Sequence, residues 1–263
     1  MPTVTSKDGT TIVYSVQGSG PALVLVDGAL CSRNFGPMPG YSKLLADSFT
    51  VHWYDRRGRG ESGDTPPYQL QREVEDLAAI IQATGTTPFV FGASSGAALG
   101  LHGAAAGLPV QKLLMYEAPY VPVPPGGKTA SQHVAALWEL VRGERRGAAV
   151  RYFMCDVVGM PKVVGYLFAL FPMWGKLKAV AHTLPYDLTI MADESLLASR
   201  VRGLKVPTMV AGGGKSPQSL KDAVTTVASA LPGSTVRWVP GQTHNLAAAP
   251  AVAMMRGFFL GTA

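Results

Sequence analysis

The feature that most constrains the fold is a recurring pattern of short apolar runs that end in turn residues. Such runs are typical of strands buried on both faces of a sheet. They read TTIVYSVQG, ALVLVDG, FTVHWYDRRG, PFVFGASSG, KLLMYEAP, PTMVAGGG and STVRWVPG. From the second run onward they alternate with segments of helical length and composition near residues 39–48, 70–84, 95–106, 217–231 and 247–260. This alternation predicts a mainly parallel sheet flanked by helices, with room for antiparallel strands at its start.

One long segment interrupts the alternation. From Tyr120 to Val206 the chain has no clear core strand, and its apolar pattern is helix-like and interrupted by prolines. An insertion at the carboxyl edge of a parallel sheet lies where such sheets bind ligands. We therefore predict a core of residues 1–120 and 204–263 and a helical lid, or cap, of residues 121–203. Candidate pocket residues in the lid, each of which could instead belong to the lid's own core, are Phe153, Met154, Tyr166, Phe168, Phe171, Met173 and Trp174.

Composition narrows the class of protein. A chain of 263 residues fits one α/β domain, with or without an inserted lid. Charged residues make up 15% of it, against about 25% in an ordinary domain, so we expect some exposed surface to be apolar. The net charge is +6, but the basic residues are dispersed, which favours a solvated surface over a nucleic-acid site.

Several other function classes are disfavoured. Two cysteines, Cys31 and Cys155, are too few for a disulfide framework, and the N-terminus lacks the apolar core of a signal peptide, so we expect a cytoplasmic protein. The uncharged run 77–111 is broken by TGTTP and by glycines, which argues against a membrane span. GRGESG, residues 58–63, lacks the helix that must follow a dinucleotide-binding loop. No spacing of His, Cys and carboxylates suggests a metal, and we expect no cofactor.

The most specific motif is Gly92-Ala93-Ser94-Ser95-Gly96, between an apolar strand and a helix of small residues. A serine on a sharp strand-to-helix turn needs neighbours without side chains, because the backbone there is strained and tightly packed. The turn lifts the Ser94 hydroxyl clear of the sheet. The next amide, that of Ser95, then lies at a helix N-terminus, where it can donate to an oxyanion. We predict that Ser94 is a nucleophile.

A serine needs a base to act as a nucleophile at neutral pH. The best placed of the five histidines is His244, in VPGQTHNLAAAP, between the last apolar strand and the last helix. A loop at that point returns to the carboxyl edge of the sheet. The others lie within predicted strands, helices or the lid and are His52, His102, His133 and His182.

The order VDGAL, DRRGRGES, GASSG, a lid and GQTH resembles the α/β-hydrolase superfamily over nearly the whole chain. The resemblance implies the α/β-hydrolase fold, with an eight-stranded sheet and a lid inserted after the sixth strand, and a triad in the chain order nucleophile, acid, histidine. It also implies a second oxyanion donor from the loop that here reads Asp27-Gly28-Ala29. This loop lacks the usual His-Gly, so both the Gly28 and the Ala29 amide are candidates.

The usual place for the acid, after the strand PTMVAGGG, contains no carboxylate, and the next one along the chain, Asp222, is expected to face solvent. The strand KLLMYEAP, one strand nearer the serine, ends in Glu117. Some members of the superfamily take their acid from that strand, and the chain is most similar to zearalenone-type lactone hydrolases in this respect. The resemblance therefore implies that Glu117 accepts the Nδ1 proton of His244; a helix cap or an arginine pair is the alternative role.

The resemblance thus implies a carboxylic ester hydrolase, an esterase or lactonase, that acts through an acyl-enzyme, and the apolar lid favours a small hydrophobic substrate. Two alternatives stay open: a cofactor-free non-hydrolytic or acyl-transfer enzyme of the same fold, and a receptor that binds a small ligand under the lid. We expect no nucleic-acid partner, and a homodimer is compatible with the sequence.

Overall fold

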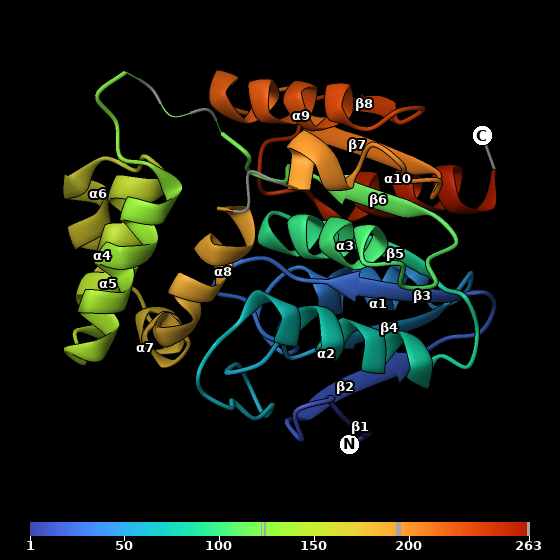
Figure 1. Ribbon diagram of the computed structural model, residues 1–263, viewed down its shortest axis with the longest axis horizontal. Coiled ribbons are helices and arrows are strands. Elements are labelled where there is room, and N and C mark those ends of the chain that lie inside the picture. The colour runs from blue at the N-terminus through green and yellow to red at the C-terminus, as the bar shows by residue number, and fades with distance from the viewer. Residues whose placement is uncertain (122, 124, 193–195, 262–263) are drawn as a thin grey trace.

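An eight-stranded sheet forms the centre of the molecule (Figure 1). The computed structural model describes residues 1–121, 123, 125–192 and 196–261. The strand order is β1-β2-β4-β3-β5-β6-β7-β8, and the strands are β1 Thr3–Thr5, β2 Thr11–Gln17, β3 Ala22–Val26, β4 Thr50–Tyr54, β5 Phe89–Ala93, β6 Leu113–Tyr116, β7 Thr208–Gly213 and β8 Thr235–Val239. The predicted fold class is confirmed, and the structure adds the short strand β1 to the seven runs found in the sequence.

The sheet is parallel except at its beginning. β1 and β2 pair antiparallel, as do β2 and β4, whereas β4, β3, β5, β6, β7 and β8 run in one direction. The register aligns the ends of neighbouring strands, with Val26 of β3 opposite Gly92 and Tyr116 of β6 opposite Ala93 and Ala211. The loops that follow β3, β5, β6, β7 and β8 consequently meet at one edge of the sheet.

Helices cover both faces of the sheet. One apolar cluster joins the sheet to α1 (Met38–Leu45) and α10 (Ala248–Leu260). A second cluster joins the other face to α2 (Leu70–Ala83), α3 (Ser95–Ala105) and α9 (Gln218–Ala230). α3 is buried over almost its whole length because its sequence, SGAALGLHGAA, presents small residues on every side. These five helices match the five helical segments expected in the core.

The segment between β6 and β7 is helical in its described part. It contains α4 Ala130–Arg142, α5 Arg146–Tyr152, α6 Lys162–Leu167, α7 Trp174–Ala179 and α8 Leu184–Met191, with short π-helical turns at Phe153–Val157 and Leu196–Arg200 and 3₁₀ turns at Phe168–Leu170 and Ala181–Thr183. A capping box between Thr129 and Gln132 begins α4. Helices α4 to α7 form a group beside the core, and α8 lies between this group and α3 (Figure 1). The lid role of this segment and its boundaries, 121–203, stay predictions.

Among the described residues, no helix combines the length and the apolar character that crossing a membrane requires.

Candidate active site

Ser94 lies on the turn between β5 and α3, with φ 55° and ψ −127°. This is a strained conformation for a residue with a side chain. The two motif glycines make the turn possible: a Cβ on Gly96 would meet the carbonyl oxygen of Val26, and a Cβ on Gly92 would meet that of Gly96. The Ser94 N–H donates to the carbonyl of Tyr116 at 2.9 Å, which ties the turn to the end of β6.

Glu117 follows β6 directly, is fully buried and also has a positive φ, 46°. Its Oε2 accepts a hydrogen bond from His244 Nδ1 at 2.8 Å, and its Oε1 accepts one from the Gly213 N–H at 2.7 Å. An ionised carboxylate only accepts, so this contact places a proton on Nδ1 and leaves Nε2 free to act as a base. Burial raises the pKa of Glu117, but the hydrogen bonds from His244 and Gly213 outweigh it and hold the pKa below its usual range.

The end of β7 has no room for an acid. A Cβ on Gly213 would lie 2.5 Å from the carbonyl oxygen of Gln242 and 2.7 Å from the Ser216 hydroxyl. Glycine at this position therefore lets the loop that carries His244 pass directly over the strand end. β7 contributes the Gly213 N–H to the site instead of a side chain.

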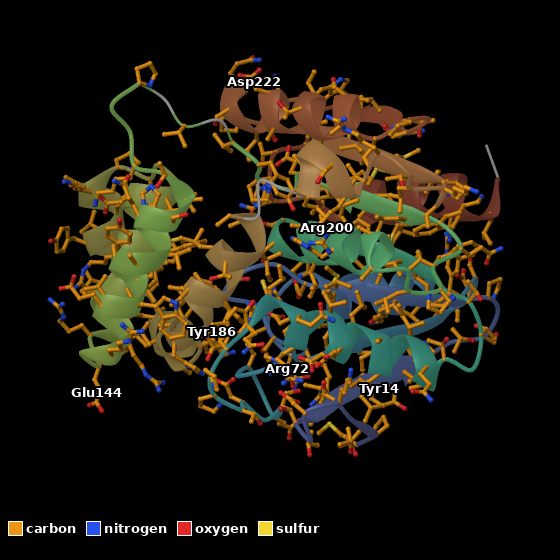
Figure 2. All side chains as sticks on the ribbon, viewed as in Figure 1. Tyr14, Arg72, Glu144, Tyr186, Arg200 and Asp222 are labelled. Atoms are coloured by element: carbon orange, nitrogen blue, oxygen red, sulfur yellow. The ribbon has the colours of Figure 1, made fainter. Side chains whose placement is uncertain are left out.

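The alternative acid, Asp222, lies at the exposed surface of α9, where it accepts a hydrogen bond from Gln218 at 2.8 Å (Figure 2). Within the described ranges its side chain makes no hydrogen bond or ion pair with the loops at the edge of the sheet. Glu117 is the carboxylate that the structure brings to His244.

Tyr116 is a site residue that the sequence reading missed. Its hydroxyl donates to the carbonyl of Thr243, the residue before His244, while its own carbonyl holds the Ser94 amide. One residue at the end of β6 thus fixes both the serine turn and the histidine loop. Its position next to Glu117 in MYEAP is the only signal in the sequence that could have singled it out.

Ser94 and His244 lie on loops at the same edge of the sheet, after β5 and after β8. Within the described residues no hydrogen bond joins the Ser94 hydroxyl to the imidazole, whose side chain is 40% exposed. Catalytic hydrogen bonds are often long or misaligned without substrate and tighten in the complex. The arrangement is compatible with a serine nucleophile and a histidine base.

The loop Asp27–Ala29 runs beside the serine. A Cβ on Gly28 would lie 3.0 Å from Ser94 Cβ and 3.6 Å from Ser94 Oγ. The Gly28 N–H donates to Asp27 Oδ1 at 3.0 Å, whereas in the described part of the chain the Ala29 N–H donates no hydrogen bond. Of the two candidates for the second oxyanion donor, Ala29 is therefore the one whose amide is available.

Asp27 is a second buried carboxylate at this edge. Burial raises its pKa to about 7, and the Gly28 amide and the nearby arginines Arg59 and Arg56 only partly oppose the effect. Its Oδ2 has no hydrogen-bond partner among the described residues. The site thus combines one carboxylate that is stabilised as the anion, Glu117, with one that is stabilised as the acid.

The residues predicted to line a pocket divide into two groups. Phe153, Met154, Phe168 and Trp174 belong to an apolar cluster that includes Ala29 and Leu30 of the loop after β3. The other three lie outside that cluster and are more exposed: Tyr166 by 67%, Phe171 by 55% and Met173 by 37%. A role in substrate binding stays a prediction for all seven, and because the cluster consists mostly of residues of the inserted segment, the packing of the first group also fits the alternative, the core of that segment.

A buried network of charges next to the serine turn was also missed. Arg56 and Arg59 of the DRRGRGES segment pair with Asp187 of α8, and all three side chains are almost completely buried. Their pairing spans 131 residues between Arg56 and Asp187, so no local pattern in the sequence indicates it.

No group of three or more His, Cys, Asp or Glu residues in the described ranges is arranged to hold a metal ion. Two surface clefts, of about 330 and 750 Å³, contain none of the residues at this edge. The first lies at the opposite ends of the strands, near His52, and the second lies on the inserted helices, near Arg146.

Comparison with known proteins identifies relatives of the chain. The model of a family described as the alpha/beta hydrolase family matches residues 23–255. The crystal structure of an alpha/beta hydrolase from Sphaerobacter thermophilus DSM 20745 is 44% identical and superposes with a TM-score of 0.88, over 98% of this chain and 100% of that one. An enol-lactonase from Burkholderia xenovorans LB400 is 18% identical, with a TM-score of 0.74 over 99% and 100% of the two chains, a likeness of fold.

Two curated proteins match over shorter segments. An uncharacterized hydrolase of Bacillus subtilis (strain 168), YraK, is 34% identical over 97 residues, which is 35% of each chain. The pimeloyl-[acyl-carrier protein] methyl ester esterase of Stenotrophomonas maltophilia (strain R551-3) is 41% identical over 106 residues, 39% of this chain and 38% of that protein. The chain thus spans little more than a third of the length of the curated relatives it matches.

Proposed function

The chain belongs to the alpha/beta hydrolase family, and from this premise we propose that it is a serine hydrolase of carboxylic esters or lactones. The observation that carries the proposal is the 2.8 Å hydrogen bond between His244 Nδ1 and the buried Glu117, beside the strained turn of Ser94. A histidine oriented by a buried carboxylate beside a strained serine turn is the arrangement that activates a hydroxyl nucleophile. The ester hydrolases among the similar proteins are in line with this reaction class.

In the proposed mechanism, Ser94 Oγ attacks the ester carbonyl while His244 Nε2 takes its proton. Glu117 keeps the other ring nitrogen protonated and stabilises the imidazolium that forms. The alkoxide that develops on the carbonyl oxygen is held by the N–H groups of Ser95 and Ala29. His244 then returns the proton to the leaving alcohol, and water hydrolyses the acyl-enzyme by the same steps in reverse order.

The oxyanion donors account for a large part of the rate. Backbone N–H groups fixed at the place where charge develops need no reorganisation during the reaction. One such donor contributes about 3 to 4 kcal/mol to the stability of the transition state. The Ser95 N–H has this position because α3 begins at Ser95, so its N-terminal amides point toward the turn.

We propose a hydrophobic, medium-sized acyl or lactone group as the substrate. Support comes from the apolar cluster that contains Ala29, the proposed oxyanion donor, and Leu30 together with Phe153 and Met154 of the inserted segment. An ester whose acyl chain enters between the loop and these side chains would bury apolar surface at about 25 cal/mol per Å².

The test is steady-state hydrolysis of chromogenic acyl esters of increasing chain length and of an aromatic macrolactone. We expect turnover with a preference for longer acyl chains, and its complete loss in Ser94→Ala. Ser229→Ala, which removes an exposed hydroxyl on α9, is the matched control and should retain full activity. A folded protein without turnover on any of these substrates, or activity that survives in Ser94→Ala, would contradict the proposal.

A further inference from the structure

The buried charges beside the serine turn form a compact cluster, the Arg56–Arg59–Asp187 cluster. Asp187 accepts two hydrogen bonds from Arg59 Nη2, at 2.7 and 2.8 Å, and one from Arg56 Nη1 at 2.9 Å. Glu73 neutralises Arg56 from the other side at 2.7 and 2.8 Å. Charges are seldom buried unless every donor has a partner. The hydrogen bonds that Arg56 and Arg59 donate to groups outside the cluster therefore indicate which segments these arginines position.

Between them, the two arginines also bond to both segments that supply the proposed oxyanion donors. Arg59 Nη1 donates to the carbonyl of Gly28 at 2.6 Å. Arg56 Nη1 lies 3.1 Å from the Ser95 hydroxyl and 3.3 Å from the carbonyl of Asp27. The Ser95 hydroxyl in turn donates to Asp187 Oδ1 at 2.6 Å.

The contact between Arg59 and Gly28 fixes the direction of the Ala29 amide. The Gly28 carbonyl and the Ala29 N–H belong to one planar trans peptide group, so they point in opposite directions. A guanidinium that holds the carbonyl oxygen on one side turns the N–H to the other side. Gly28 lies close to Ser94, and the Ala29 N–H donates to no acceptor within the described residues. This N–H is therefore available to a substrate carbonyl.

The acid at the centre of this cluster comes from the inserted segment. Asp187 lies on α8. The residue before it, Tyr186, stacks on Tyr68 with 3.9 Å between ring centroids, and its hydroxyl donates a hydrogen bond to Asp64 at 2.8 Å. Figure 2 shows Tyr186 at the junction between the inserted helices and the core. Burial raises the pKa of Asp187, but Arg59 and Arg56 outweigh it and hold that pKa below its usual range, in keeping with an ionised carboxylate here.

We infer that Arg59 and Asp187 are positioning residues for the oxyanion hole: Asp187, presented by α8, holds Arg59, and Arg59 orients the Gly28–Ala29 peptide toward the reacting carbonyl. The docking of α8 therefore completes the site. The inference rests on the proposed function. It predicts that loss of this geometry weakens binding of the tetrahedral transition state and leaves binding of the planar substrate unchanged.

The experiment compares Arg59→Lys with Arg57→Lys. Lysine cannot contact both Asp187 oxygens and the Gly28 carbonyl with one fixed fork of donors. We expect kcat of Arg59→Lys to fall about 10- to 100-fold, a part of what removal of an oxyanion donor causes, with KM unchanged within about threefold. The affinity for an alkyl trifluoromethyl ketone, which forms a tetrahedral adduct with the serine, should fall by the same factor.

Arg57 is the matched control because it is equally buried and forms an equally tight pair. It binds Asp76 at 2.7 Å through two nitrogens and contacts neither Gly28 nor Ser95. Arg57→Lys should lower the midpoint of thermal unfolding to a similar extent, with kcat and ketone affinity near wild type. Equal losses of kcat in the two variants, or normal kcat in Arg59→Lys, would overturn the inference.

Asp187→Asn, which preserves the side-chain volume, is measured alongside in case Arg59→Lys does not fold, and it should show the same selective loss of kcat. Unchanged kcat in a folded Asp187→Asn would also overturn the inference. Labelling of the wild-type protein with a fluorophosphonate distinguishes a failure of the proposed function from a failure of this inference. If Ser94 is not labelled and no ester is hydrolysed, the proposed function fails and this inference with it; if Ser94 reacts and turns over esters but the variants behave alike, only the inference fails.

Discussion

The carboxyl ends of β6 and β7 lie side by side in the sheet, yet they contribute different groups to the site. β6 is followed directly by Glu117, whose side chain is buried and bound to His244. β7 ends in Gly213, which contributes only a backbone N–H to the same carboxylate. The two ends are complementary, because the glycine leaves the space through which the histidine loop reaches the neighbouring strand.

The difference shows that the position of an acid in such a site depends on backbone clearance as well as on the residue itself. A glutamate on β6 can reach the histidine only if the end of β7 carries no side chain, since a Cβ at Gly213 would meet the carbonyl of Gln242 at 2.5 Å. Changes at the two strand ends should therefore lower activity for different reasons. A change at Glu117 alters the electrostatics of the His244 imidazole, and a change at Gly213 displaces the loop that carries His244.

The largest effect should come from Glu117→Gln. Glutamine accepts and donates, so it can favour the wrong tautomer of His244 and cannot stabilise the imidazolium. We expect kcat for ester hydrolysis to fall about 1,000-fold or more, with only a small decrease in the midpoint of thermal unfolding at neutral pH. Asp222→Asn, at the exposed carboxylate on α9, serves as the control and should stay within about twofold of wild type. Near-normal kcat in Glu117→Gln would remove Glu117 from the site.

A smaller loss is expected from Gly213→Ala. The added methyl group would displace the loop that carries His244, and displacement of a catalytic group by about 1 Å costs up to about 100-fold in rate. Overpacking should also lower the free energy of unfolding by about 1 to 3 kcal/mol. Gly40→Ala in α1, where no atom lies within 4 Å of the new Cβ, should be neutral or slightly stabilising. If Gly213→Ala retained wild-type kcat and stability, the clearance argument would be wrong.

The two buried carboxylates should respond to pH in opposite directions. For Asp27 the folded pKa, about 7, lies above the ordinary 3.8, so the folded protein keeps a proton that the unfolded chain has lost. The free energy of unfolding should then fall as the pH rises between these values, by up to about 1.4 kcal/mol per pH unit. Urea titrations of the wild type and of Asp27→Asn as a function of pH test this. Parallel curves for the two proteins would show that Asp27 is not protonated in the folded state.

The smallest effect concerns Glu117, whose folded pKa is lowered. The unfolded chain takes up the proton first when the pH falls, so the stabilisation from this carboxylate is present above its ordinary pKa and is lost as the pH falls through the folded one. The wild type should therefore lose its advantage in unfolding free energy over Glu117→Gln on acidification from about pH 7 to pH 3. An advantage that grew on acidification would mean that Glu117 binds its proton more tightly in the folded state.

Much of the fold could be predicted from the sequence, because it depends on local patterns. Apolar runs and the segments between them correspond to seven of the eight strands and five core helices. The glycines around Ser94 and the loop position of His244 are local signals of the same kind, and Glu117 was predicted from the absence of a carboxylate after PTMVAGGG together with the resemblance to the superfamily.

What could not be predicted depends on contacts between distant segments. The pairing of Arg56 and Arg59 with Asp187 joins the loop after β4 to α8, and charge patterns along the chain do not indicate which buried acid an arginine meets. Likewise, aromatic residues of the inserted segment look alike in the sequence, although Phe153 is buried in the apolar cluster that includes Ala29 and Leu30, whereas Tyr166 is exposed.

The central claim, that Glu117 acts through His244 on Ser94, is tested most directly by a double-mutant cycle in kcat/KM for one chromogenic ester. The four proteins are the wild type, Glu117→Gln, His244→Ala and the double variant, with Ser94→Ala as the blank. Groups that act as one unit are not additive, so the double variant should be no slower than His244→Ala alone. Losses that multiply, with the double variant slower than either single variant by the full product, would mean that Glu117 and His244 act independently and would contradict the account.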